Sequence, residues 1–114
     1  MKIDRFEEII AWQKGKQLTV LVYKTFKSNK DFSFKNQIER ASVSIMNNIA
    51  EGFERQTNKE FKNFLYIAKG SCGEVRSMTL LAEDLGYVQK NESIVLINLT
   101  VEISRLLSGL IKTL

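Results

Sequence analysis

The sequence contains no histidine and no proline, and its single cysteine is Cys72. Histidine is the usual proton-transfer group near neutral pH, so acid-base catalysis lacks its commonest residue here. A di-metal helical bundle built on Glu-x-x-His motifs is excluded for the same reason. Cys72 falls on an apolar helical face, where a thiol is normally buried and inert. We therefore expect no catalytic residue, no metal ligands and no cofactor.

The chain also lacks a long apolar run and a second cysteine. No segment approaches the roughly 18 apolar residues that a membrane span requires. The N-terminal residues MKIDRFEE lack the apolar core of a signal peptide. A lone cysteine forms no internal disulfide, which is typical of proteins in reducing compartments. These features together predict a cytoplasmic protein with no membrane contact.

Apolar residues recur at helical spacing in four segments, and the absence of proline favours long helices. The predicted helices cover about residues 6–26, 33–54, 58–85 and 92–113. Asn58 is the predicted N-cap of the third helix, and Gly86 is its predicted left-handed stop. No segment alternates apolar and polar residues for long, so a sheet is not expected. The sequence predicts an all-α fold, a single domain over residues 1–114 that forms an up-down-up-down four-helix bundle.

The second predicted helix carries two stripes at a period of 3.6 residues. The apolar stripe, which we expect to face the core, comprises Phe34, Ile38, Ala41, Ile45, Ile49 and Phe53. The polar stripe comprises Gln37, Arg40, Ser44, Asn47, Asn48, Glu51 and Arg55. An amphipathic surface helix needs only the first stripe. The polar stripe is therefore a candidate structural or binding element.

Two interpretations of the polar stripe remain open. In the structural one, its residues pair with one another, with a neighbouring subunit or with Glu74 of the third helix, and Arg40 and Glu74 form a buried pair. In the functional one, the stripe faces a small-molecule pocket or nucleic acid. The balance of acids and bases within the stripe suits mutual pairing better than phosphate binding. A third surface of Val43, Met46 and Ala50, between Glu39 and Glu54, predicts a packing patch for a second subunit.

The formal net charge is +4, and it arises near the N-terminus. Residues 1–30 hold seven Lys and Arg against three Asp and Glu, whereas the remainder holds ten of each. Candidate nucleic-acid-binding residues are therefore Lys14, Lys16, Lys24 and Lys27. The alternative is that these lysines form an ordinary solvated helix face. Gly70 and Gly73 lie inside a helical pattern, where their small size favours close approach of another helix.

Three groups of residues match a known family in order and at natural spacing. The first comprises Phe6, Trp12, Gln13 and Tyr23. The second comprises residues 37–41, Ser44, Ile45, residues 48–52 and Arg55. The third comprises Glu60, Phe61, residues 67–71, Glu74 and residues 85–87. On these residues the chain resembles the small bacterial four-helix-bundle proteins encoded in intervening sequences of 23S ribosomal RNA genes.

The resemblance implies a left-handed bundle that assembles into a ring, commonly a pentamer. The related accessory protein of diversity-generating retroelements is a basic pentamer that binds a reverse transcriptase and nucleic acid. Met46 departs from the family, which usually has proline there, so the second helix should be straighter. We expect a non-enzymatic homo-oligomer that contacts RNA, DNA or a nucleic-acid enzyme. The alternative is a structural or protein-interaction oligomer with no nucleic-acid binding.

Overall fold

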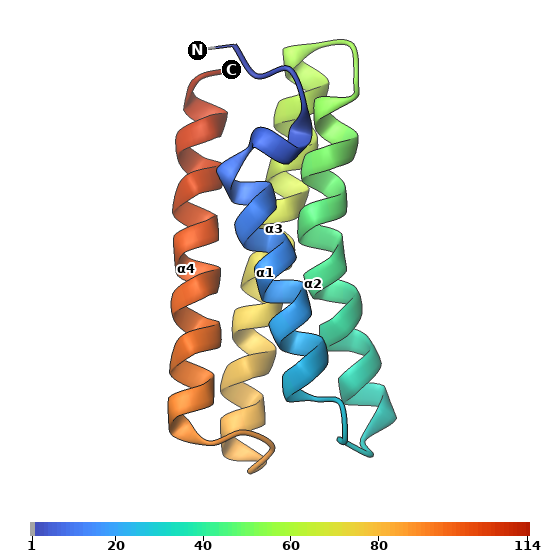
Figure 1. Cartoon of the computed structure of the whole chain (residues 1–114), viewed down its shortest axis with the longest axis vertical. Helices are drawn as coiled ribbons and strands as arrows, with labels where there is room; N and C mark the ends of the chain where they lie inside the picture. Colours follow the sequence, from blue (N-terminus) through green and yellow to red (C-terminus); the bar gives the residue numbers. More distant parts are fainter. Residues whose placement is uncertain (1) are drawn as a thin grey trace.

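The computed structural model describes residues 2–114, and over them the chain is all α-helical with no strand. One short 3₁₀ helix precedes four α-helices: η1 Phe6–Glu8, α1 Ile10–Thr25, α2 Phe32–Phe53, α3 Asn58–Asp84 and α4 Lys90–Lys112. Figure 1 shows the four α-helices side by side, with both chain ends at the same end of the molecule. The predicted all-α fold with four helices is confirmed.

Each α-helix packs against the next in the chain, and α1 also packs against α4. Within residues 2–114, α1 makes no contact with α3, and α2 makes none with α4, so these pairs are diagonal. Figure 1 shows the same arrangement, with α1 in front and α3 behind. The Thr19 hydroxyl donates to the Ser42 carbonyl oxygen at 3.1 Å, and Gly15 lies against Met46. Residue numbers thus rise along α1 as they fall along α2, so these two helices are antiparallel.

One apolar core runs along the bundle. The side chains with no solvent exposure are Leu18, Val22, Ile38, Ile45, Ile49, Leu65, Ala68, Val75, Ala82, Leu96, Ile103 and Leu107. The predicted apolar stripe of α2 is confirmed, since its first five members are buried and Phe53 packs at the edge. Ile10 and Leu85 are apolar but are 52% and 49% exposed. Both lie at helix ends, where no facing helix covers them.

Capping decides where the helices begin. α3 starts after Thr57, not after Asn58, because the Thr57 backbone is extended and its hydroxyl oxygen accepts from the Glu60 N–H at 3.1 Å. α4 starts at Lys90, earlier than predicted, because Gln89 and Glu92 form a reciprocal capping box. Sequence spacing alone did not identify either cap.

The other ends follow backbone geometry. α1 starts at Ile10 and not near residue 6, because Ile9 is extended and separates it from the 3₁₀ turn. Gly86 has a φ of 73°, in the left-handed region that favours glycine, and it follows the end of α3. The Tyr87 N–H then donates to the Ala82 carbonyl oxygen at 2.8 Å. The predicted glycine stop is confirmed.

Two connections meet at one end of the bundle through Asp31 and Tyr87. Asp31 caps α2 by accepting from the Phe34 N–H at 3.2 Å, and its second carboxylate oxygen accepts from the Tyr87 hydroxyl at 2.6 Å. The Tyr87 ring packs edge-on against Phe34, with centroids 5.2 Å apart. This contact ties the α1–α2 loop to the α3–α4 loop.

Replacing Tyr87 with phenylalanine is expected to lower the free energy of unfolding at neutral pH. The Tyr87 hydroxyl lowers the pKa of Asp31, and Asp31 in turn raises the pKa of Tyr87. The Asp31 contribution is therefore lost as pH falls through its depressed folded-state pKa. The Tyr87 contribution is lost as pH rises through its elevated folded-state pKa.

Urea unfolding of wild type and Tyr87→Phe across a pH series measures this difference. The gap in stability should be widest between the two pKa values and should narrow on both sides. A gap that is constant with pH would show that the hydrogen bond does not contribute.

α4 is more apolar than the sequence analysis predicted. By length and composition alone it could cross a membrane, which corrects the expectation that no segment approaches such a span. In this fold it is a core helix, since Leu96, Ile103 and Leu107 are fully buried. Its Glu102 carboxylate lies 3.7 Å from the Lys14 ammonium of α1. Only 28% of its most apolar window is buried, so α4 also carries apolar side chains at the surface, such as Ile94 and Val95.

Candidate functional site

The four candidate lysines of α1 do not form one patch. Lys14 faces α4 and pairs with Glu102 at 3.7 Å. Lys16 and Lys24 are exposed and lie about 80° apart around α1, and Lys27 is exposed in the turn that follows the helix. The Lys16 ammonium lies 5.6 Å from the centre of the Trp12 ring, within cation-π range. Three of the four lysines therefore form the basic outer face of α1.

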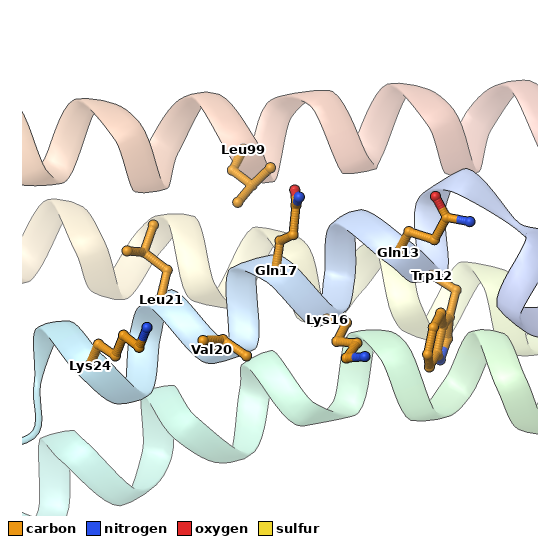
Figure 2. Close-up of a pocket in the computed structure, with 8 residues that line it drawn as sticks. All are labelled: Trp12, Gln13, Lys16, Gln17, Val20, Leu21, Lys24 and Leu99. Carbon is orange, nitrogen blue, oxygen red and sulfur yellow. The ribbon is translucent and has the colours of Figure 1, made fainter.

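A shallow hollow of about 610 Å³ lies along this face. Its lining is Trp12, Gln13, Lys16, Gln17, Val20, Leu21, Lys24 and Leu99. Figure 2 shows Leu99 of α4 directed towards α1, with Gln17 and Leu21 directed towards α4. Val20 is 46% exposed, so the hollow combines apolar surface with two ammonium groups. Such a surface suits a partner with both apolar and anionic groups.

Part of the polar stripe joins α2 to α3. The Gln37 side-chain amide donates to Glu74 Oε2 at 3.4 Å, and the Ser44 and Ser71 hydroxyls lie 2.9 Å apart. The Asn48 amide donates to the Ser44 carbonyl oxygen at 2.8 Å and to its hydroxyl at 2.9 Å. These hydrogen bonds run along the rim of the α2–α3 contact, where they fix the two helices relative to each other.

The end of the stripe is an exposed charge network. Arg55 lies 3.8 Å from Glu51 and 3.2 Å from Glu60, and its guanidinium sits over the Phe64 ring. Hydrogen bonds from Thr57 and Arg55 lower the pKa of Glu60. Ion pairs that are exposed to solvent in this way are weak, because water and salt screen the charges. The network therefore adds little to stability.

The predicted buried pair of Arg40 and Glu74 is wrong. Both side chains are exposed, and within residues 2–114 Arg40 forms no ion pair. Both line an open polar hollow of about 500 Å³ between α2 and α3. Asn47 is likewise exposed. Helical phase placed Arg40 and Glu74 beside the core, but they lie on the rim, where water reaches them.

The predicted subunit patch of Val43, Met46 and Ala50 is partly covered within the single chain and stays a prediction. All three residues are half-buried within the single chain. Met46 lies against Gly15 of α1, where a methyl group added to the glycine would sit 3.5 Å from the Met46 Cβ. This part of α2 is therefore covered by α1. Packing within the chain explains the apolar side chain at Met46.

Of the remaining candidates from the sequence, Cys72 is buried in the core, whereas Gly70 and Gly73 lie in open space. Cys72 is 2% exposed, and burial raises its pKa to about 12, so it is a neutral thiol at physiological pH. Gly70 and Gly73 have open space around them, so the prediction that they permit close helix approach is wrong within the chain. Among residues 2–114, no three His, Cys, Asp or Glu side chains come together to hold a metal ion.

One basic feature was missed by counting charges along the chain. Lys62, Lys69 and Arg76 recur every seven residues of α3, so they share one face of that helix. Residues 31–114 hold equal numbers of acidic and basic residues. This equality concealed the row, because a count along the chain does not show on which helix face each charge lies. Seven-residue spacing of like charges was the signal that could have identified it.

The model of the 23S rRNA-intervening sequence protein family matches residues 7–109. The chain belongs to this family. A crystal structure of a family protein from Bacteroides thetaiotaomicron, described as an S23 ribosomal protein family member of unknown function, is similar. The two share 28% identity with a TM-score of 0.84, over 90% of this chain and 98% of the other. No curated protein matches the sequence.

Proposed function

We propose that this protein is a non-enzymatic, ring-forming helical bundle whose basic α1 face contacts nucleic acid or a nucleic-acid enzyme. The observation that carries the proposal is the exposure of the Lys16, Lys24 and Lys27 side chains along α1 and the turn after it. In the part of the chain that the structure describes, none of the three forms an ion pair. Cations without partners on one helix face attract a polyanion, and a ring would repeat them in every subunit.

The proposed bundle is left-handed, with up-down-up-down topology, and acts in the cytoplasm without membrane contact. The antiparallel α1–α2 contacts support this topology. Exposed apolar side chains support assembly into a ring, which we expect to be a pentamer. They are Ile67, Leu80, Leu81, Leu85, Ile94 and Val95. Apolar surface of this extent is typical of a contact between subunits.

The alternative function is a structural or protein-interaction oligomer that binds no nucleic acid. The pairing of Lys14 with Glu102 favours it, because one of the four candidate cations is already neutralised. Absence of catalysis is part of both proposals. Its support is the neutral buried thiol of Cys72 and the lack of histidine.

Replacing Lys16, Lys24 and Lys27 with glutamine is expected to weaken nucleic-acid binding and flatten its salt dependence. Each phosphate contact contributes about −0.9 to the slope of log affinity against log salt on duplex DNA. Titration of wild type and variant with labelled RNA and DNA over a salt series measures the slope. Binding should be tolerant of sequence, because phosphates carry no base information.

Lys14→Gln is the control for a single lysine, to be compared with Lys16→Gln, since each removes one charge from α1 and only Lys14 is paired. Lys14→Gln should leave the slope nearly unchanged. Light scattering should report the same multi-subunit mass for wild type and all the variants. If wild type retains no RNA or DNA even at about 50 mM salt, where such contacts are strong, the alternative function takes first place.

A further inference from the structure

The flank of α3 next to α4 carries a straight row of three cations, of which Lys62 and Lys69 are half-buried and Arg76 is exposed. Lys62, Lys69 and Arg76 are each seven residues apart, and seven residues fall only about 20° short of two helical turns. The rise per residue separates neighbours by about 10 Å, so the row extends over about 21 Å. This length exceeds what one compact anion can bridge. The row therefore fits an extended polyanion.

The acids of α3 at its start and middle are directed to other partners. Glu60 accepts from the Arg55 guanidinium at 3.2 Å, and Glu74 accepts from the Gln37 amide of α2 at 3.4 Å. Both carboxylates thus lie on the α2 side of α3. Among residues 2–114, the three cations of the row form no ion pair. Their charge is not offset from within the helix.

The acids nearest the other end are also accounted for. Glu83 pairs with Lys90 at 2.9 Å, and Asp84 is the last residue of α3, about two turns beyond the row. On α4, Glu92 closes the capping box, and Glu102 pairs with a lysine of α1. Among the described residues, no carboxylate of α4 therefore forms an ion pair with a cation of the row.

A notch of about 180 Å³ lies between α3 and α4 beside the row. Its lining is Lys69, Cys72, Gly73, Arg76, Thr100, Val101 and Ser104. Gly73 has no other atom within 4 Å of the place where a Cβ would stand, so the surface between the two cations is bare. The Ser104 side chain makes no hydrogen bond to the described residues and remains available as a donor. A phosphate group would meet two cations and a hydroxyl here.

Tyr66 adds an aromatic ring to the same face. It lies one turn from Lys62 and is 55% exposed. A nucleobase stacks on an exposed aromatic ring whatever its sequence, whereas duplex bases are already stacked on one another. We propose that this flank of α3 binds single-stranded nucleic acid, with a backbone phosphate in the notch between Lys69 and Arg76 and a base on Tyr66.

This proposal deepens the proposed function and rests on it, yet it concerns a separate surface. α1 and α3 are diagonal in the bundle, and none of their Cα atoms come within 8 Å of each other. The α1 face and the α3 row therefore cannot be one patch on a single chain. Variants of each surface can be tested independently, so failure of one proposal is distinguishable from failure of the other.

A carboxylate placed in the notch tests the site with one substitution. Gly73→Glu should weaken binding of a labelled oligo(dT) by about tenfold or more, because it sets a negative charge between two cations. Gly70→Glu is the matched control on the same helix. Both glycines have open space, so both variants should fold, and both lose the same net charge. Equal effects of the two variants would overturn the proposal.

A second arm distinguishes a stacked single strand from any polyanion. Tyr66→Leu should weaken oligo(dT) binding by about tenfold and leave binding of inorganic polyphosphate unchanged, because only the oligonucleotide can stack. Replacing Lys62, Lys69 and Arg76 with glutamine should lower the salt slope on single strands by about 2, at about 0.7 for each contact. Unchanged oligo(dT) binding by Tyr66→Leu would overturn the stacking role and leave only a polyanion surface.

The α1 lysine variant completes the comparison. If the α3 variant binds oligo(dT) like wild type while the α1 variant loses binding, the α3 proposal fails and the proposed function stands. If the α3 variant loses binding while the α1 variant does not, the α3 site holds and the α1 face is only solvated. Absence of wild-type binding to every probe at low salt would overturn both.

Discussion

Replacing Gly52 with alanine is expected to lower the free energy of unfolding by about 1–3 kcal/mol or more. The added methyl group would stand 2.6 Å from the Phe64 Cβ and 3.0 Å from the Phe61 ring. Carbon atoms do not approach so closely, so α2 and α3 would have to separate near their connection. The glycine is required there by the close approach of α3, since its φ is not positive.

Gly70→Ala is the control for this prediction. No atom outside the helix lies within 4 Å of its Cβ position, so the methyl group meets only solvent. Alanine favours the helix over glycine by about 1 kcal/mol. Urea unfolding followed by circular dichroism should therefore show opposite signs for the two variants. If both variants lost the same amount of stability, the loss at Gly52 would not arise from its close contact with Phe61 and Phe64.

Replacing Phe26 with alanine is expected to cost about 3–5 kcal/mol of stability. Phe26 is 1% exposed and packs edge-on against Phe34, with centroids 5.4 Å apart. Phe34 in turn packs against Tyr87, whose hydroxyl bonds Asp31. Removing the first ring leaves a cavity beneath the end of the bundle where two loops meet.

Phe32→Ala removes the same side chain from a site that is 63% exposed, and it should change stability by no more than about 0.5 kcal/mol. Thermal or urea unfolding of both variants measures the contrast. The Phe26→Ala effect should also be non-additive with Tyr87→Phe, because the two residues share Phe34 as a neighbour. Additive effects would show that the aromatic cluster does not act as a unit.

Local sequence patterns predicted much of the fold. Residues such as Ile38, Ile45 and Ile49 recur every three to four positions, so any helix that contains them presents one apolar face. That face is buried as expected. Gly86 marked the end of α3 because a left-handed residue is needed there and only glycine adopts it without strain. The caps at Thr57 and Gln89 were missed, since several neighbouring residues had suitable side chains.

The sequence by itself determined that the chain is helical, which face of α2 is apolar, and that α1 is basic. Tertiary structure alone decided which charges face each other. Lys14 is paired because α4 brings Glu102 to it, whereas Arg40 and Glu74 are exposed because the α2–α3 contact leaves them on its rim. The seven-residue spacing of the cationic row is present in the sequence, but tertiary structure decided that Glu60, Glu74 and Glu83 of α3 meet other partners. Helical periodicity is a property of a few neighbouring residues, but the identity of the helix that covers each face depends on how all four pack.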